Sequence, residues 1–212
     1  IHSIPYSVAQ PLERGSNNYY SIIQGVLRIF GRETGTGVYG EKRRILIEIM
    51  DFLKTERLVL RNLMPQDADV MFDYRNNEIC SRYQKGQTKD YAEIAKMIER
   101  CRADVLSAEA PFMVAVALME SDEMIGEIVV KPKTDMIELG YTFSYRYHRR
   151  GYAFEALTVL IDQLHRMAPD RAFISFVEPQ NIASMGLLRK LGYRDMGYVP
   201  EIESQMFGKW TN

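Results

Sequence analysis

The sequence is poor in the residues and runs that mark disulfide-stabilised, metal-binding or membrane proteins. Its two cysteines, Cys80 and Cys101, are too few for a disulfide framework, and their spacing fits no metal site. No apolar run approaches the ~18 residues of a membrane span, and the basic, apolar and small-residue pattern of a signal peptide is missing. We therefore expect a cytoplasmic protein without a bound metal, in which Cys101, at helical spacing with apolar neighbours, fills the core.

Excess charge of either sign is also lacking. The 27 basic residues (Lys and Arg) nearly balance the 28 acidic ones, which leaves a formal net charge of −1. Proteins that bind nucleic acid through bulk electrostatics carry a positive excess. Of the 212 residues, 46% are hydrophobic, enough for the core of one ordinary domain. The composition predicts a globular domain with neither a nucleic-acid nor a membrane partner.

Residues 1–49 differ from the rest because they hold six of the 14 glycines. The stretch Gly35–Gly40 matches the dinucleotide pattern G-x-G-x-x-G, but no series of βαβ units follows it. The V-A-I-K, H-R-D and D-F-G motifs that would accompany a kinase loop are missing as well. We expect residues 1–49 to be a flexible or weakly docked extension, with Met50 a candidate native start, and residues 50–212 to form the functional domain.

From residue 55 onward the hydrophobic pattern predicts a regular succession of elements. Tight links between residues 112 and 143 favour an antiparallel meander, and the apolar run of residues 172–177 is typical of a strand covered on both faces. The order predicts an α+β fold, with a mixed, largely antiparallel sheet of about seven strands and helices on both faces. The predicted strands are 57–61, 112–118, 124–130, 136–143, 172–177, 193–199 and 204–210, and the predicted helices are 65–76, 90–101, 151–167 and 181–192.

The turn from His148 to Ala153 carries charge of the wrong sign for its position. It opens a long amphipathic helix, and a helix N-terminus has partial positive charge and unpaired N–H groups that attract anions. Here the turn instead supplies two cations, Arg149 and Arg150. An anion bound between the guanidinium groups and the exposed amides would resolve the conflict. We interpret the turn as a phosphate-binding site.

Four motifs occur in a fixed order between Thr55 and Trp210: T-E-R-L-x-L-R, E-L-G-Y, R-G-Y-A-x-E-A and P-x-N-x-A-S-x-x-L-x-x-L-G-Y. In this order and spacing, the sequence resembles the GNAT superfamily of acetyl-CoA-dependent N-acetyltransferases. It is most similar to the RimJ/RimL type, which acetylates ribosomal-protein N-termini and related amines. The resemblance implies the GNAT fold and direct transfer of an acetyl group from acetyl-CoA to a primary amine.

The resemblance also implies where acetyl-CoA binds. The family's pyrophosphate signature, Q/R-x-x-G-x-G/A, aligns with the turn; Gly151 and Ala153 match it, while His148 replaces Gln or Arg. Backbone N–H groups supply most of the binding in such a turn, and the two arginines can add charge-assisted hydrogen bonds. The residues expected to bind the phosphates are His148, Arg149, Arg150, Gly151, Tyr152 and Ala153.

The remainder of the cofactor site follows from the other motifs. The strand that ends in Thr142 and Phe143 is expected to diverge from the next strand, as in relatives. Its free backbone groups would then bind the pantetheine arm and the thioester oxygen. Asn181 and Ser184 match the family's cofactor-side N-x-x-S, and Asn181 also fits a plain helix N-cap.

The expected catalytic residues are a base and an acid. Many relatives protonate the leaving thiolate with a tyrosine at the position of Leu188; the RimJ/RimL pattern lacks it and suggests Ser184 instead. Glu138 on the central strand and Glu203 before the last strand are the candidate bases, with Glu127 a third. An α-amine of pKa ~7.7–8.0 needs only a modest base, whereas a lysine of pKa ~10.4 is mostly protonated near pH 7.

The acceptor site is expected between the first two helices and the last two strands. Its acidic residues would suit a cationic amine, such as a peptide N-terminus, a polyamine or an antibiotic amine of the aminoglycoside type. The chain is expected to act as a monomer or homodimer. The candidate lining residues are Arg75, Glu78, Tyr83, Glu201 and Glu203.

Two alternatives remain open at this point. A domain of the same fold could bind acetyl-CoA without catalysis and serve a regulatory role. A dinucleotide enzyme that uses Gly35–Gly40 would bind NAD(P) and lose that binding when residues 1–49 are deleted. Thiol release with a panel of amines separates the enzyme from the regulatory domain.

Overall fold

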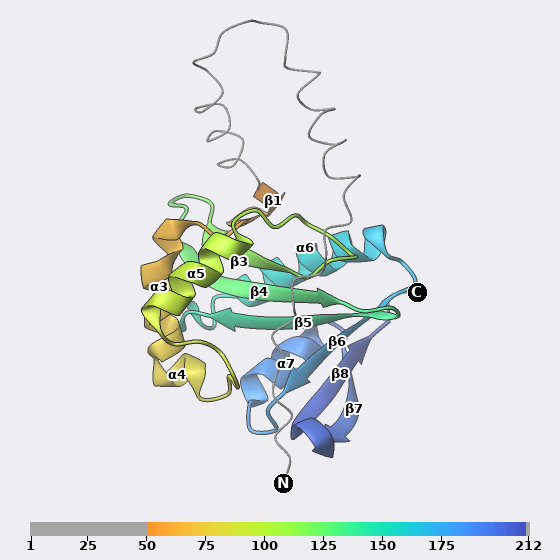
Figure 1. The fold of residues 1–212 in the computed structure, drawn as a ribbon. Helices are drawn as coiled ribbons and strands as arrows, with labels where there is room; N and C mark the ends of the chain where they lie inside the picture. Colours follow the sequence, from red (N-terminus) through yellow and green to blue (C-terminus); the bar gives the residue numbers. More distant parts are fainter. Residues whose placement is uncertain (1–50, 211–212) are drawn as a thin grey trace, which may run out of the picture. The chain divides into compact units, whose positions relative to one another are not determined.

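The computed structural model describes residues 51–210, so the predicted extension and its Gly35–Gly40 motif lie outside the described residues. One mixed sheet of eight strands has the order β1-β2-β3-β4-β5-β6-β8-β7, antiparallel throughout except between β5 and β6 (Figure 1). The strands are β1 (Asp51–Lys54), β2 (Leu58–Arg61), β3 (Phe112–Leu118), β4 (Met124–Pro132), β5 (Met136–Phe143), β6 (Ala172–Val177), β7 (Arg194–Val199) and β8 (Ser204–Lys209). The helices are α3 (Ala68–Asn76), α4 (Glu78–Ser81), α5 (Tyr91–Cys101), α6 (Tyr152–Met167) and α7 (Ile182–Lys190), with 3₁₀ turns η1 (Pro65–Asp67), η2 (Tyr145–Tyr147) and η3 (Pro200–Ile202).

The predicted fold class is confirmed, with one strand more than expected. The additional strand, β1, pairs antiparallel with β2 and carries a bulge between Asp51 and Leu53. Its four residues show no alternation of buried and exposed side chains, so the period that reveals a strand is missing. The short helix α4 was also not predicted: Asn77, read as a helix stop, is its N-cap and accepts a hydrogen bond from the Ile79 amide at 2.9 Å.

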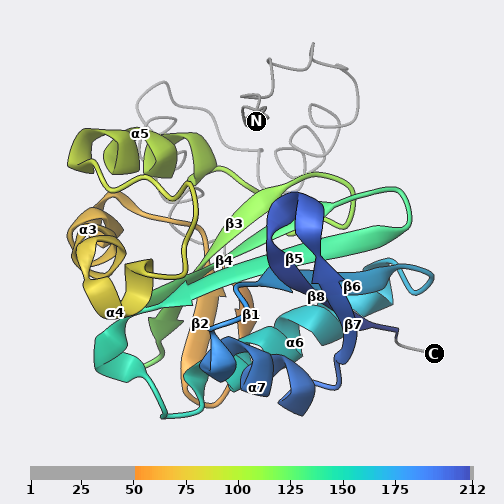
Figure 2. The ribbon, with the colours of Figure 1, turned by 90° about the horizontal axis from the view of Figure 1, so that it is seen from below.

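Helices cover both faces of the sheet, as the sequence predicted (Figure 2). On one face lie α6 and α7, on the other α3, α4 and α5, and each face has its own apolar cluster. The stripe of α6 consists of Leu157, Leu160, Ile161 and Leu164, each at most 1% exposed. This i, i+3, i+4, i+7 spacing places all four on one side of the helix. Each such side chain stabilises the fold by roughly 1.5–3 kcal/mol through burial.

The central sheet opens between β5 and β6. These strands are parallel neighbours only where residues 136–138 face residues 172–174. Beyond that point β6 turns away with β8, while β5 continues along β4 as far as Phe143 (Figure 1). The predicted divergence is therefore present, and the last five residues of β5 have no strand on the β6 side.

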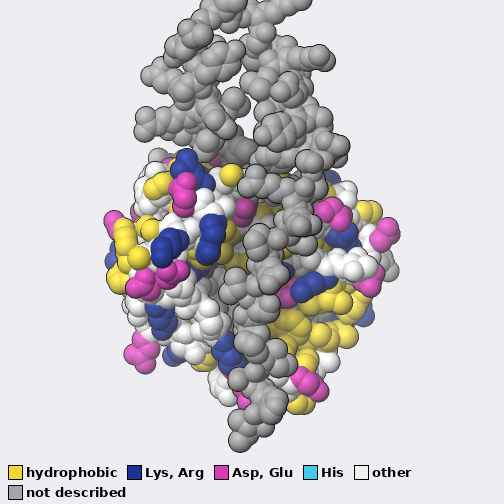
Figure 3. Space-filling view, in the orientation of Figure 1, with side chains coloured by type: hydrophobic (Ala, Val, Ile, Leu, Met, Phe, Trp, Pro, Cys, Tyr) yellow, Lys and Arg dark blue, Asp and Glu magenta, His cyan; other side chains and the backbone are white. Residues whose placement is uncertain are grey.

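Charged side chains are mixed on the face seen in Figure 3, where Lys and Arg lie among Asp and Glu. Such a surface lacks the one-signed patch of a nucleic-acid binder. None of the helices in residues 51–210 combines the length and apolar character that a membrane crossing requires. Within the same range, no group of three or more His, Cys, Asp or Glu side chains could hold a metal ion.

Candidate cofactor and catalytic site

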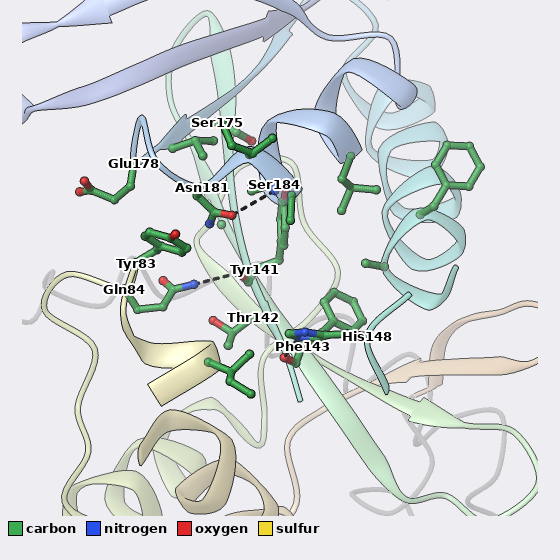
Figure 4. A pocket seen from close by; sticks show the side chains of 18 of the residues that line it. Tyr83, Gln84, Tyr141, Thr142, Phe143, His148, Ser175, Glu178, Asn181 and Ser184 are labelled. Atoms are coloured by element: carbon green, nitrogen blue, oxygen red, sulfur yellow. Dashed lines mark hydrogen bonds between the residues drawn. The ribbon is translucent and has the colours of Figure 1, made fainter. Parts of the chain in front are cut away.

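A cleft of about 1000 Å³ lies where β5 and β6 separate. Its walls are the second half of β5, the end of β6, the N-terminal turns of α6 and α7, and the segment that follows α4 (Figure 4). The cleft thus brings together the E-L-G-Y strand, the basic turn that follows it closely, and the N-x-x-S helix, which lies tens of residues further along the sequence. This is the position of the predicted cofactor site.

The basic turn has a backbone suited to anions. Arg149 has φ 62° and Gly151 φ 83°, both left-handed. A backbone in which left- and right-handed helical conformations follow one another presents successive N–H groups to one side, an arrangement known as a nest; here left-handed Gly151 is followed directly by right-handed α6. Gly151 occupies the N-cap of α6 and provides no side-chain hydrogen bond to the first amides. The amides at the start of α6 are therefore left for another partner.

The side chains of the turn add to this character. Arg149 and Arg150 are both exposed. In the part of the chain that the structure describes, neither guanidinium pairs with a carboxylate; that of Arg150 lies 5.4 Å from the centre of the Tyr147 ring. Arg149 lines the cleft and Arg150 is not among its lining residues. Unneutralised guanidinium groups beside open amides are of a kind that suits a dianion such as a pyrophosphate, and the binding of phosphate by both arginines stays a prediction.

An ion pair behind the turn holds it in place. Arg57, just before β2, donates to the Arg150 carbonyl at 3.2 Å and to Glu155 of α6 at 2.8 Å. Burial of Glu155 opposes its ionisation, but hydrogen bonds from Thr55 and Arg57 outweigh that effect and lower the pKa of Glu155. Sequence reasoning missed this role. Its signal was Arg57 in the motif T-E-R-L-x-L-R together with Glu155 in the later motif R-G-Y-A-x-E-A.

His148 links the turn to the sheet. Its Nε2 lies 2.9 Å from the Phe143 carbonyl oxygen. Because a carbonyl only accepts hydrogen bonds, this nitrogen carries the proton. His148 thus fixes the end of β5 against the turn, and its predicted contact with phosphate stays a prediction.

The free edge of β5 presents alternate residues to the cleft. Ser175 of β6 donates to the Leu139 carbonyl at 2.8 Å, and Gln84 donates to the Tyr141 carbonyl at 3.2 Å (Figure 4). Together with the Phe143 carbonyl described above, these carbonyls belong to every second residue of β5. In a strand, the N–H and C=O of one residue point to the same side. Leu139, Tyr141 and Phe143 therefore direct their backbone groups toward the cleft.

Thr142 lies in the other phase of this alternation. A Cβ built on Gly126 of β4 would lie 2.7 Å from the Thr142 carbonyl oxygen, so this carbonyl faces β4. The Thr142 hydroxyl accepts a hydrogen bond from Gln87 at 3.2 Å. The predicted backbone contact thus fits Phe143 but falls to Tyr141 instead of Thr142. Backbone groups of successive strand residues point to opposite sides. One known contact of β5 would therefore have been enough to tell that Tyr141, and not Thr142, faces the cleft.

The start of α7 is closed by its own side chain. The Asn181 carbonyl oxygen accepts a hydrogen bond from the Ser184 amide at 3.1 Å, so the predicted N-cap is present (Figure 4). The Ser184 hydroxyl lies 2.7 Å from the Tyr141 hydroxyl. Burial raises the pKa of Tyr141 to about 12, against the opposing effect of the Ser184 hydrogen bond. Tyr141 is therefore a protonated phenol throughout the physiological range.

The candidate bases lie away from this centre. Glu138 pairs with Lys131 at 3.1 Å, and the side chain of Glu203 is 76% exposed. Neither is among the residues that line the cleft. The carboxylate that does line it is Glu178, directly after β6, which pairs with Lys85 at 2.7 Å. Glu178 was not singled out from the sequence, and the catalytic roles of Glu138 and Glu203 stay predictions.

Glu127 is engaged elsewhere. Its carboxylate is buried and accepts hydrogen bonds from Arg75 at 2.7 and 2.8 Å and from Gln87 at 2.8 Å. These hydrogen bonds occupy both carboxylate oxygens, and Glu127 is not among the residues that line the cleft. Arg75, expected in the acceptor site, is likewise only 3% exposed. Of the expected acceptor residues, Tyr83 lines the cleft.

The cysteines show no sign of nucleophilic activation. Burial raises the pKa of Cys101 to about 11, and it also raises the pKa of Cys80. Reactive cysteines have a lowered pKa. Cys101 packs against the α3–α5 cluster, which agrees with its predicted role in the core.

Comparisons with known proteins bear on the family and the fold. A family model described as "Acetyltransferase (GNAT) domain" matches residues 57–194. The "Uncharacterized N-acetyltransferase p20" of Bacillus licheniformis is 28% identical over 158 residues, or 73% of this chain and 88% of that protein. The acetyltransferase from Agrobacterium tumefaciens str. C58 has a TM-score of 0.62 at 22% identity, covering 85% of this chain and 100% of that one. RimL, a ribosomal L7/L12 alpha-N-protein acetyltransferase solved with coenzyme A, has a TM-score of 0.65 at 14% identity, covering 76% and 98%.

Proposed function

The chain belongs to the GNAT family of N-acetyltransferases, and on that premise we propose that it transfers an acetyl group directly from acetyl-CoA to a primary amine. The observation that carries the proposal is the cleft, in which a cationic nest and the free edge of a strand face one another. The nest suits the pyrophosphate of acetyl-CoA. The strand edge suits the pantetheine arm, which contains two amide groups and can pair with the backbone like an added strand.

The reacting thioester then lies near the end of β5. The N–H groups of Tyr141 and Phe143 are on the cleft side by the alternation described above. An amide directed at the thioester oxygen stabilises the negative charge that develops there when the amine attacks. The C–N bond forms, the C–S bond breaks, the sulfur leaves with the electron pair, and the proton that the attacking amine loses passes to the proposed base. Ser184, which lines the same cleft, is the proposed partner of the leaving sulfur.

The acceptor must be neutral to attack. An α-amino group of pKa ~7.7–8.0 is partly neutral near pH 7, whereas a lysine amine of pKa ~10.4 is not. The cleft wall holds a single Asp or Glu, Glu178, which is already paired with Lys85. An environment with little basic capacity favours an acceptor of low pKa. We therefore favour a peptide N-terminus over a polyamine or an antibiotic amine, with Glu138 and Glu203 as proposed bases.

The test is release of free CoA from acetyl-CoA, with a panel of peptide N-termini, polyamines and aminoglycosides. Turnover that depends on one class of amine is expected, with peptides the best acceptors. Binding of CoA without turnover on any amine would overturn the proposal in favour of a regulatory domain. Failure to bind CoA would overturn both.

A further inference from the structure

The Ser184 hydroxyl has only one hydrogen-bond partner among the described residues, the Tyr141 hydroxyl at 2.7 Å. Each group has one proton, and either can be the donor. If Ser184 donated to Tyr141, the phenol proton would be left without an acceptor among the described residues, on a half-buried side chain that itself lines the cleft.

The opposite direction is favoured because a phenol, with an ordinary pKa of about 10, is a stronger acid and a better donor than an aliphatic hydroxyl. When Tyr141 donates, the lone pair of Ser184 is occupied and its own proton must point away from Tyr141. Ser184 stands at the cleft wall, so its proton is then directed into the cleft.

The surrounding contacts hold this geometry rigidly. The Ser184 amide is fixed by Asn181 at 3.1 Å, and the Tyr141 carbonyl is fixed by Gln84 at 3.2 Å. Figure 4 shows Asn181, Ser184 and Tyr141 at the same wall of the cleft. A donor that is oriented before the reaction stabilises developing charge without a reorganisation cost.

We propose that Tyr141 is a positioning residue, whose phenol donates to Ser184 so that the Ser184 hydroxyl proton is directed at the leaving sulfur of CoA. The inference rests on the proposed acetyl transfer. No proton need change atoms in this step: the C–S bond breaks, the sulfur takes the electron pair, and the Ser184 O–H hydrogen bond stabilises the thiolate. The thiol, with pKa ~8.5, is acidic enough to leave in this form.

The test is a double-mutant cycle with Tyr141→Phe and Ser184→Ala, read as kcat and KM for acetyl-CoA at saturating amine. Each single variant is expected to lower kcat roughly tenfold, since one charge-assisted hydrogen bond is lost or misdirected. The double variant is expected to lose no more than either single, because the two groups act as a unit. The KM for acetyl-CoA should change less than threefold, or about 0.6 kcal/mol in affinity.

The matched control is Tyr193→Phe. Tyr193 is a second buried tyrosine, and its hydroxyl makes no hydrogen bond with Ser184. Its loss should leave kcat unchanged. If Tyr141→Phe fails to fold, a fluorinated tyrosine at position 141 keeps the shape and strengthens the donor. A change in kcat is then expected, and an unchanged kcat would refute the proposal.

The outcomes separate the two proposals. Wild-type turnover is measured first; if no amine is acetylated, the proposed function fails and this inference fails with it. If the wild type turns over while Tyr141→Phe retains full kcat, or if the two losses add, only the role of Tyr141 is refuted. A drop in kcat for Tyr193→Phe as large as for Tyr141→Phe would also refute it, by indicating a general packing effect.

Discussion

Two helices begin at the same cleft, and they treat their N-terminal amides in opposite ways. At α7, Asn181 accepts a hydrogen bond from the Ser184 amide, so the chain satisfies this end itself. At α6, the N-cap is Gly151, which supplies no such bond, and two exposed arginines stand before it. A glycine N-cap is less favourable than a side-chain cap such as asparagine by about a few tenths of a kcal/mol. Helix α6 incurs that cost, whereas α7 does not.

The two helix ends differ in their proposed roles: the start of α6 binds a ligand, and the start of α7 positions a side chain. The start of α6 also contains Arg149 in the left-handed region, which costs roughly 1–2 kcal/mol for a residue with a side chain. Both costs are incurred where a phosphate would offset them. The closed end of α7 instead holds Ser184 in a defined place beside Tyr141. One end is left open for a ligand, and the other is closed to position a side chain.

The largest expected effect comes from reversing the charge of the open end. Arg149→Glu/Arg150→Glu should weaken CoA binding about 100-fold or more, since charge-assisted hydrogen bonds contribute roughly 1.5–3 kcal/mol each. The free protein should be as stable as the wild type or slightly more so, because anions suit a helix N-terminus. Calorimetric titration and urea unfolding measure the two effects. The control, Arg100→Glu/Arg102→Glu at the end of α5, makes the same change in net charge away from the cleft and should leave CoA affinity intact.

A smaller effect is expected when alanine replaces either of two glycines, Gly151 or Gly186, in separate variants. Gly151→Ala should destabilise the fold by about 1–2 kcal/mol and weaken CoA binding, because φ 83° is unfavourable for alanine. Gly186→Ala, within α7, meets no atom within 4 Å and should stabilise the fold by about 0.5–1 kcal/mol. Urea unfolding compares them. Shifts of the same sign would contradict the assigned role of Gly151.

The N-terminus of α7, which Asn181 caps, should respond differently to substitution. Asn181→Ala is expected to cost about 1 kcal/mol of stability through the lost cap, and to lower kcat because Ser184 is less well placed. Asp90→Ala removes a comparable cap from α5, where Asp90 accepts from the Glu93 amide at 2.9 Å, and should cost similar stability with unchanged kcat. If Asn181→Ala reduced CoA affinity as much as the arginine reversal, the contrast between the two ends would be lost.

The smallest effect is a dependence of stability on pH. Since the pKa of Glu155 is lowered in the folded state, the ionised group stabilises the fold above its ordinary pKa of 4.5, and this stability is lost as pH falls through the folded pKa. Wild type should exceed Glu155→Gln by about 1 kcal/mol or less at pH 7, and the gap should close below pH ~4.5. Unfolding at a series of pH values checks this. The matched control, Glu99→Gln, removes one carboxylate from an exposed pair with Arg102.

Local signals made most of the fold and the binding turn predictable. The apolar spacing of α6 and the caps Asp90 and Asn181 are properties of neighbouring residues, and the structure contains all of them. The turn was found because its charge conflicts with the helix that follows it. Its match to the family pattern, through Gly151 and Ala153, is equally local.

What the sequence did not reveal depends on contacts between distant residues. Arg57 meets Glu155 across 98 positions, and Tyr141 meets Ser184 across 43. No periodicity encodes such pairs. The phase of β5, which decides between Tyr141 and Thr142, is likewise set by pairing with β4. Glu127 looked like an available base until the fold placed it in a buried pair.

The central claim is that the open end of α6 binds the pyrophosphate of CoA, and a change in the ligand tests it most directly. Pantetheine lacks the phosphates but retains the arm that would follow β5. Wild type should bind CoA about 100-fold more tightly than pantetheine, and in Arg149→Glu/Arg150→Glu this preference should shrink to a few-fold. Equal affinity of the wild type for both ligands, or a full preference for CoA in the reversed variant, would contradict the account.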